Sequence, residues 1–184
     1  QLGTGFFNYA ANNSGHLPAW SGWHNVGGNG TGDDDTGPGW MEEIASTYAD
    51  PRSPVYNCPA FPPGNPMNYF LAARWLKLNG RQSWLLTDIK DSSEFVLSGD
   101  TTHGHLYPPP FGWAPHVIPD CDKDDAVGPA LVFFGEEEGF NVHRAGNNVL
   151  FADRHVAPFK RFNSNDMTFS PHNRGQSWDD VTPD

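Results

Sequence analysis

The sequence predicts an α+β domain, and three observations lead to this prediction. Apolar residues at helical spacing begin the chain, several short strand-like segments follow, and one of these runs directly into a turn and a returning strand. A length of 184 residues suits one domain, which we take to cover residues 1–184. We therefore expect a helix at the start of the chain, packed on an antiparallel sheet.

The first expected element is a helix over residues 1–14. Leu2, Phe6 and Tyr9 lie at helical spacing, and the helix is expected to close on a glycine cap at Gly15. Because no N-cap residue precedes Leu2, the chain is expected to enter this helix in mid-course. The first half of this helix would then lie upstream of Gln1, where a hydrophobic anchor is one alternative.

The expected strands are short and widely spaced. The other predicted elements are a short helix at 41–48, a short extended piece at 54–59, and strands at 68–73, 93–98 and 147–152. Asp153 and Arg154 then stand where a two-residue hairpin turn would fall, with residues 155–159 as the returning strand. The 20 Gly and 17 Pro indicate long irregular connections between these elements.

The charge balance excludes several classes of partner. Eleven Lys and Arg against twenty-two Asp and Glu give a formal net charge of −11, which repels polyphosphates and anionic lipid surfaces. The sequence also holds no run of eighteen apolar residues of the kind that spans a bilayer. We expect no nucleic-acid partner, and membrane contact only through a missing N-terminal helix.

The segment from His143 to Val156 carries a His, nine intervening residues and an Asp. It resembles the signature of the prepilin-like (pseudopilin) family known for a His, nine residues, Asp-Gly motif. Three further passages occur in the same order as in that family. They are the end of a helix followed by Leu-Pro at 8–18, a Trp…Tyr…Cys-Pro passage at 40–59, and a passage that ends in Gly-Asp at 87–100. The likeness covers most of the chain, with gaps at the Gly/Asp-rich loop and at 101–140.

This resemblance implies a type IV pilin-like head, with a truncated N-terminal helix packed on an antiparallel sheet with long loops. It implies a non-enzymatic, structural subunit of a pseudopilus (type II secretion) or type IV pilus-like filament. The expected partners are other pilin-like subunits. The expected location is the bacterial cell envelope, in the periplasm or in an extracellular filament.

Four residues of the motif are candidates for a special role: His143, Asp153, Arg154 and His155. Arg154 stands where the family has Gly, a position that needs a positive φ if the turn is type I′. His143 and Asp153 are expected to fix loop geometry through hydrogen bonds, with Asp100 as a further partner of the imidazole. A metal site of Asp100, His143 and Asp153 is the alternative.

An acidic stretch is the candidate calcium site. Its carboxylates fall at near-alternate positions: Asp120, Asp122, Asp124 and Asp125. An EF-hand is excluded, because it requires Gly at position 125 and Glu at position 131, and the sequence has neither. Because major pseudopilins of similar fold bind calcium in a loop beside the sheet, the resemblance favours a looser calcium site here. A solvated acidic loop is the alternative.

Two other function classes stay open. Aromatic residues among Gly and Pro are typical of a secreted carbohydrate-binding module: Trp20, Trp23, Trp40 and Trp113. A His/Asp metallohydrolase would use the His-x-His pair at His103 and His105 together with His143 or His155, although no surrounding hydrolase motif is present.

The two cysteines, Cys58 and Cys121, are far apart and show no Cys-x-x-Cys spacing. Neither a zinc ribbon nor a thioredoxin-like redox motif is therefore indicated. One disulfide and two separate buried thiols remain equal alternatives. A disulfide would close a loop of about 60 residues and contribute about 4 kcal/mol to stability.

Overall fold

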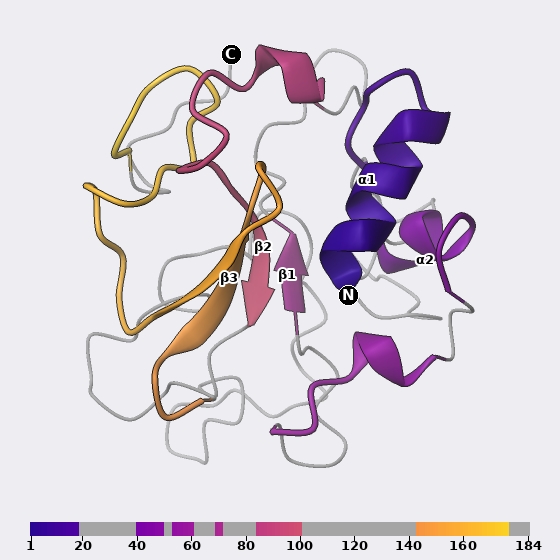
Figure 1. Ribbon diagram of the computed structural model, residues 1–184, viewed down its shortest axis with the longest axis horizontal. Helices are drawn as coiled ribbons and strands as arrows, with labels where there is room; N and C mark the ends of the chain where they lie inside the picture. Colours follow the sequence, from indigo (N-terminus) through magenta and orange to yellow (C-terminus); the bar gives the residue numbers. More distant parts are fainter. Residues whose placement is uncertain (19–39, 50–52, 61–68, 72–83, 101–142, 177–184) are drawn as a thin grey trace, which may run out of the picture.

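The computed structural model describes residues 1–18, 40–49, 53–60, 69–71, 84–100 and 143–176, without the side chains of 40–42, 70 and 71. Two α-helices lie beside one antiparallel sheet in this part of the chain (Figure 1). This confirms the predicted α+β class. No helix within the described residues is long and apolar enough to cross a membrane.

Helix α1 (Leu2–Asn12) matches the predicted N-terminal helix. It buries Phe6, Phe7 and Ala10. At its end the N–H of Gly15 donates to the carbonyl of Ala10 at 2.8 Å, and Ser14 and Gly15 have φ values of 56° and 87°. This is the six-residue bond of a Schellman cap, but Ser14 takes the first left-handed position, where glycine was expected, and Gly15 follows it.

Helix α2 (Trp40–Ala45) packs against α1. The contact is close at Gly5, where an added Cβ would lie 3.2 Å from the Tyr48 ring and 3.3 Å from Ile44. Tyr9 of α1 is hydrogen-bonded to Glu43 of α2. Burial, together with the Glu43 charge and this hydrogen bond, raises the pKa of Tyr9.

The expected extended piece at 54–59 is instead a 3-10 helix, η1 (Pro54–Tyr56), followed by extended backbone. Pro54 occupies its first turn, where the fixed φ of proline suits a helix and its missing N–H loses no bond. The N–H of Tyr56 then donates to Ser53 at 3.2 Å and that of Asn57 to Pro54 at 3.0 Å. A proline at the start of a short segment therefore began a turn of helix rather than a strand.

The sheet has four antiparallel strands in chain order, β1 (Tyr69–Leu71), β2 (Val96–Asp100), β3 (Asn147–Phe151) and β4 (Val156–Phe159). All four predicted strands are present. The β2 strand starts at Val96 rather than at residue 93, because the N–H groups of Glu94 and Phe95 both donate to Asp91 and close a turn there. A second 3-10 helix, η2 (Leu86–Asp88), precedes it.

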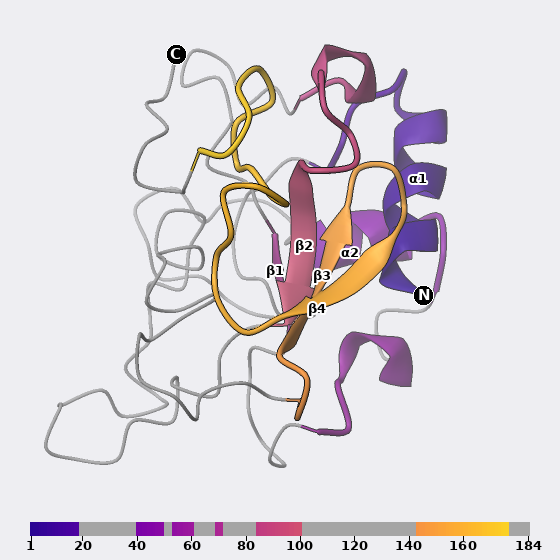
Figure 2. The same ribbon diagram turned by 60° about the vertical axis from the view of Figure 1, so that its left-hand side comes forward.

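The core lies between α1, the sheet and the segment at 163–176. Leu150 of β3 is so close to α1 that an added Cβ on Gly3 would meet its Cδ1 at 3.0 Å. From the other direction, Met167 and Phe169 are buried, and the carbonyl of Thr168 accepts from Val96 at 3.0 Å. Figure 2 shows α1 and the C-terminal segment on opposite sides of the start of β2, and every residue of that strand is buried.

The β3–β4 turn differs from the predicted two-residue turn. The N–H of Arg154 donates to Phe151, and the N–H of Phe151 donates to His155, both at 3.0 Å. The loop is therefore three residues long, from Ala152 to Arg154, and Arg154 has a φ of 82°. Three-residue hairpin loops commonly end in one left-handed residue that forms a bulge, which is why glycine is favoured at this position.

Candidate functional site

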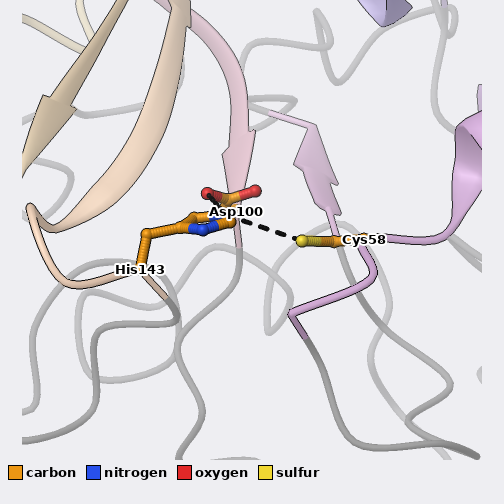
Figure 3. Close-up of side chains that lie close together, drawn as sticks. All are labelled: Cys58, Asp100 and His143. Carbon is orange, nitrogen blue, oxygen red and sulfur yellow. Dashed lines mark hydrogen bonds and ion pairs between the residues drawn. The ribbon is translucent and has the colours of Figure 1, made fainter.

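Three side chains from distant parts of the sequence converge at one end of the sheet: Cys58, Asp100 and His143 (Figure 3). Cys58 follows the 3-10 helix η1, and Asp100 is the last residue of β2. His143 lies in the turn before β3, which is closed by a 2.9 Å bond from the N–H of Gly146 to the His143 carbonyl. The antiparallel register of β2 and β3 thus brings the last two together.

The imidazole of His143 is at the centre of the cluster. Its Nε2 lies 3.2 Å from Oδ2 of Asp100 and 3.5 Å from Sγ of Cys58. One donor atom from each of the three residues lies within 4.8 Å of the other two. Since the Asp100 side chain is 3% exposed and that of His143 34%, the cluster is buried on the carboxylate side and open on the imidazole side.

Asn148 fixes the Asp100 carboxylate. Oδ2 accepts from the backbone N–H of Asn148 at 2.8 Å and from its side-chain Nδ2 at 3.0 Å. Burial raises the pKa of Asp100, while the Asn148 hydrogen bonds and the His143 charge oppose this rise. The result is an oriented carboxyl group that presents one oxygen to His143 and gains from any further positive charge beside it.

Tyr69 completes the surroundings of the thiol. Its side chain is hydrogen-bonded to Cys58. Burial first, then the charges of Cys58 and Asp100 and this hydrogen bond, raise the pKa of Tyr69 well above its ordinary value. The phenol is therefore a neutral hydrogen-bond donor at all physiological pH values.

A cavity of about 350 Å³ opens beside the three side chains. It lies between the first turn of α1, the sheet and η1, and its other walls include Leu2, Val55, Tyr69, Leu150 and Val156. Val156 is 59% exposed, so one wall is an apolar side chain at the surface. The cluster is thus accessible to a small solute.

The order of the contacts differs from that of a nucleophile relay. In a Cys-His-Asp or Ser-His-Asp triad the nucleophile and the carboxylate bond to different nitrogens of the imidazole. Here Sγ and Oδ2 both face Nε2 of His143. The contacts of Cys58 and Asp100 therefore converge on one nitrogen of His143 rather than forming a chain.

The predicted motif residues separate into two groups. Asp100 and His143 come together, whereas Asp153 lies at the opposite end of β3, in the hairpin loop. Asp153 Oδ1 accepts from the backbone N–H of His155 at 3.0 Å and lies 2.5 Å from its Nδ1. Burial alone would raise the pKa of Asp153, but the His155 contacts outweigh it and lower the pKa below its ordinary value.

Cys58 was missed as a partner of His143. The sequence left a disulfide with Cys121 and two separate buried thiols as alternatives; the structure gives Cys58 as a buried thiol, and Cys121 lies outside the described residues. The available signal was the resemblance itself, because Cys58, Asp100 and His143 come from three of its passages. No local spacing joins residues that are 85 positions apart.

The other candidate residues lie mostly outside the described part. This holds for the acidic calcium candidates, for the His-x-His pair and for three of the four tryptophans: Asp120, Asp122, Asp124, Asp125, His103, His105, Trp20, Trp23 and Trp113. Trp40 begins α2, but its side chain is not described. The calcium, sugar and hydrolase hypotheses therefore stay predictions.

The chain matches no protein-family model, no curated protein and no solved structure. The functional argument therefore depends on the residues of this chain and on the sequence resemblance described above.

Proposed function

We propose that the chain is the head of a pilin-like subunit that assembles with other pilin-like subunits into a filament of the bacterial cell envelope. Its role is structural and not enzymatic. The observation that carries the proposal is the packing of an N-terminal helix on an antiparallel sheet whose last hairpin is the motif segment (Figure 1).

The helix supports this proposal through its contacts with the sheet. Phe6 is fully buried, Phe7 is 9% exposed, and Gly3 permits close contact with Leu150. A helix that serves as the root of a filament subunit must transmit force to its head, and interdigitated side chains of this kind join the two rigidly. In the proposal, the apolar half of the helix lies upstream of Leu2.

The hairpin supports the proposal by giving the motif a structural role. The guanidinium of Arg154 lies 4.4 Å from the centroid of the Phe7 ring, so the hairpin loop contacts α1 directly. The N–H of Asp153 also donates to Ser92 at 2.9 Å, and that of Ala152 to Phe95 at 3.0 Å. The motif loop is thus held by both the helix and the segment before β2, and none of these contacts requires a reaction.

The coding sequence upstream of Gln1 tests the proposal. We expect a short basic leader and then an apolar helix of about 20 residues that continues into α1. A conventional signal peptide with an A-x-A-like cleavage site and no retained apolar helix would contradict the filament role. That result would favour the secreted carbohydrate-binding module.

A further inference from the structure

We propose that Cys58, Asp100 and His143 bind one divalent transition-metal ion, and that Zn²⁺ is the ion that fits them best. The inference does not depend on the filament role, because it uses only the contacts of these three side chains. It names a different ligand set from the acidic calcium candidates, and it replaces Asp153 by Cys58 in the metal site considered from the sequence.

Two of the three separations between the donor atoms match those around a tetrahedral ion, and the third, between Cys58 and Asp100, is within 4.8 Å. Zinc bonds are about 2.3 Å to sulfur and about 2.0–2.2 Å to nitrogen or oxygen. At tetrahedral angles such bonds place sulfur and nitrogen about 3.5 Å apart, and nitrogen and oxygen about 3.3 Å apart. The corresponding separations are 3.5 Å for Sγ of Cys58 and 3.2 Å for Oδ2 of Asp100, both measured to Nε2 of His143.

The donor types select the ion. A thiolate favours zinc and other soft or borderline ions, an imidazole suits zinc, copper, iron and nickel, and a single carboxylate is compatible with all of these. Calcium and magnesium prefer six or more oxygen ligands. A sulfur, a nitrogen and an oxygen donor at one point therefore favour Zn²⁺ over the hard cations.

The surroundings of the cluster resemble a prepared site. The Asn148 amides hold Oδ2 of Asp100, and the Tyr69 hydroxyl is hydrogen-bonded to the thiol of Cys58. Metal ligands in proteins are usually oriented by hydrogen bonds of this second-layer kind. The adjoining cavity gives an ion a route of entry and leaves a fourth coordination position for water or another ligand.

The site lies at the root of a long segment. Asp100 and His143 are the residues on either side of 101–142, and their side chains meet at 3.2 Å. An ion bound to both, and to Cys58, would join the two ends of that segment to the turn after η1. Cross-links that close long loops restrict the unfolded chain most, so the ion is expected to stabilise the fold.

Cobalt substitution tests the site on the reduced chain of residues 1–184. We expect one equivalent of Co²⁺ to give a thiolate-to-cobalt charge-transfer band and the intense visible bands of four-coordinate cobalt. One equivalent of Zn²⁺ should abolish both, whereas millimolar Ca²⁺ should not. Absence of the thiolate band, or of stoichiometric binding, would overturn the proposal without any variant.

Variants then assign the ligands. Cys58→Ser should remove the thiolate band, and Asp100→Asn and His143→Gln should each weaken Zn²⁺ binding by at least about 10–100-fold, the loss typical of disturbing even an outer-layer partner. Circular dichroism checks that each variant is folded.

Two matched controls complete the test. Cys121→Ser removes the other thiol, and His155→Gln removes the imidazole of the second His–Asp pair, whose members lie 2.5 Å apart. Both should bind Zn²⁺ like the parent chain. A thiolate band that survives Cys58→Ser, or that disappears in Cys121→Ser, would contradict the assignment.

Discussion

Replacing Arg154 by Gly separates two opposing effects in the motif loop. Arg154 has a φ of 82°, a conformation that disfavours a side chain by about 1 kcal/mol relative to glycine. Its guanidinium lies 4.4 Å from the Phe7 ring centroid, and a cation–π contact of this kind at an exposed residue is worth about 0.5–1 kcal/mol. We therefore expect Arg154→Gly to change the free energy of unfolding by less than about 0.5 kcal/mol in the parent chain.

The same substitution should behave differently once the ring is gone. In a Phe7→Leu background the contact is absent, so Arg154→Gly should stabilise by about 1 kcal/mol, or raise the melting temperature by about 2–4 °C. The coupling between the two positions is then about 0.5–1 kcal/mol in a double-mutant cycle. Because the unfolded-state entropy of glycine enters both backgrounds equally, it cancels in this difference.

Urea unfolding followed by tryptophan fluorescence measures all four proteins. Arg154→Asn serves as a second variant, because Asn tolerates the left-handed region without the added flexibility of glycine. Equal stabilisation by Arg154→Gly in both backgrounds would refute the contact with Phe7. Destabilisation by Arg154→Asn in the Phe7→Leu background, where no ring contact is lost, would refute the left-handed conformation of the loop.

Three further predictions follow from the packing and the charges. Gly146→Ala should destabilise by about 3 kcal/mol in urea unfolding, because φ is 127° and an added Cβ would clash with the Phe159 carbonyl oxygen. Gly15→Ala also has a positive φ, but its Cβ would lie in ordinary contact with Leu85 at 3.6 Å, so it should lose only about 1 kcal/mol; equal losses would refute the clash. Gly5→Val should lower the free energy of unfolding by about 1–3 kcal/mol, because the larger side chain overpacks the contact with α2. The control Thr4→Val, on the exposed face of α1, should change it by less than about 0.5 kcal/mol. A Gly5→Val variant as stable as the parent chain would contradict the close helix contact. Because the pKa of Asp153 is lowered in the folded protein, its carboxylate contributes stability above the ordinary carboxyl pKa of about 4, and this stability is lost as the pH falls through the folded value. In a plot of the urea midpoint against pH, Asp153→Asn should therefore reduce the slope on the acid side. An unchanged slope would exclude the bonds from His155.

The sequence predicted the elements whose signals are local. Apolar spacing located α1, and the Asn-Ser-Gly stretch after it indicated the cap that Gly15 helps to form. The apolar run before Asp153 located β3 and its hairpin. The length of the hairpin loop could not be predicted from the sequence. Two- and three-residue loops differ in the residues to which the backbone of Phe151 is hydrogen-bonded, and no local sequence signal specifies these.

The candidate site was predicted only in part, for a different reason. The contact between Asp100 and His143 was predicted because Asp100 ends one predicted strand and His143 lies shortly before another. Cys58 reaches the other two residues because of the path that the backbone takes after η1. Sequence periodicity does not predict this path. Asp153 was grouped with the other two because it belongs to the same motif, yet β3 places it and His143 at opposite ends.

Immunogold electron microscopy of the protein, epitope-tagged in the cells that naturally produce it, tests the filament role most directly. Chemical cross-linking of the same cells reports the partners. The proposal predicts gold label along envelope-attached fibres, together with cross-linked products that contain other pilin-like subunits. A tagged protein recovered as a monomer from the medium, with no fibre labelled and no pilin-like partner captured, would contradict it.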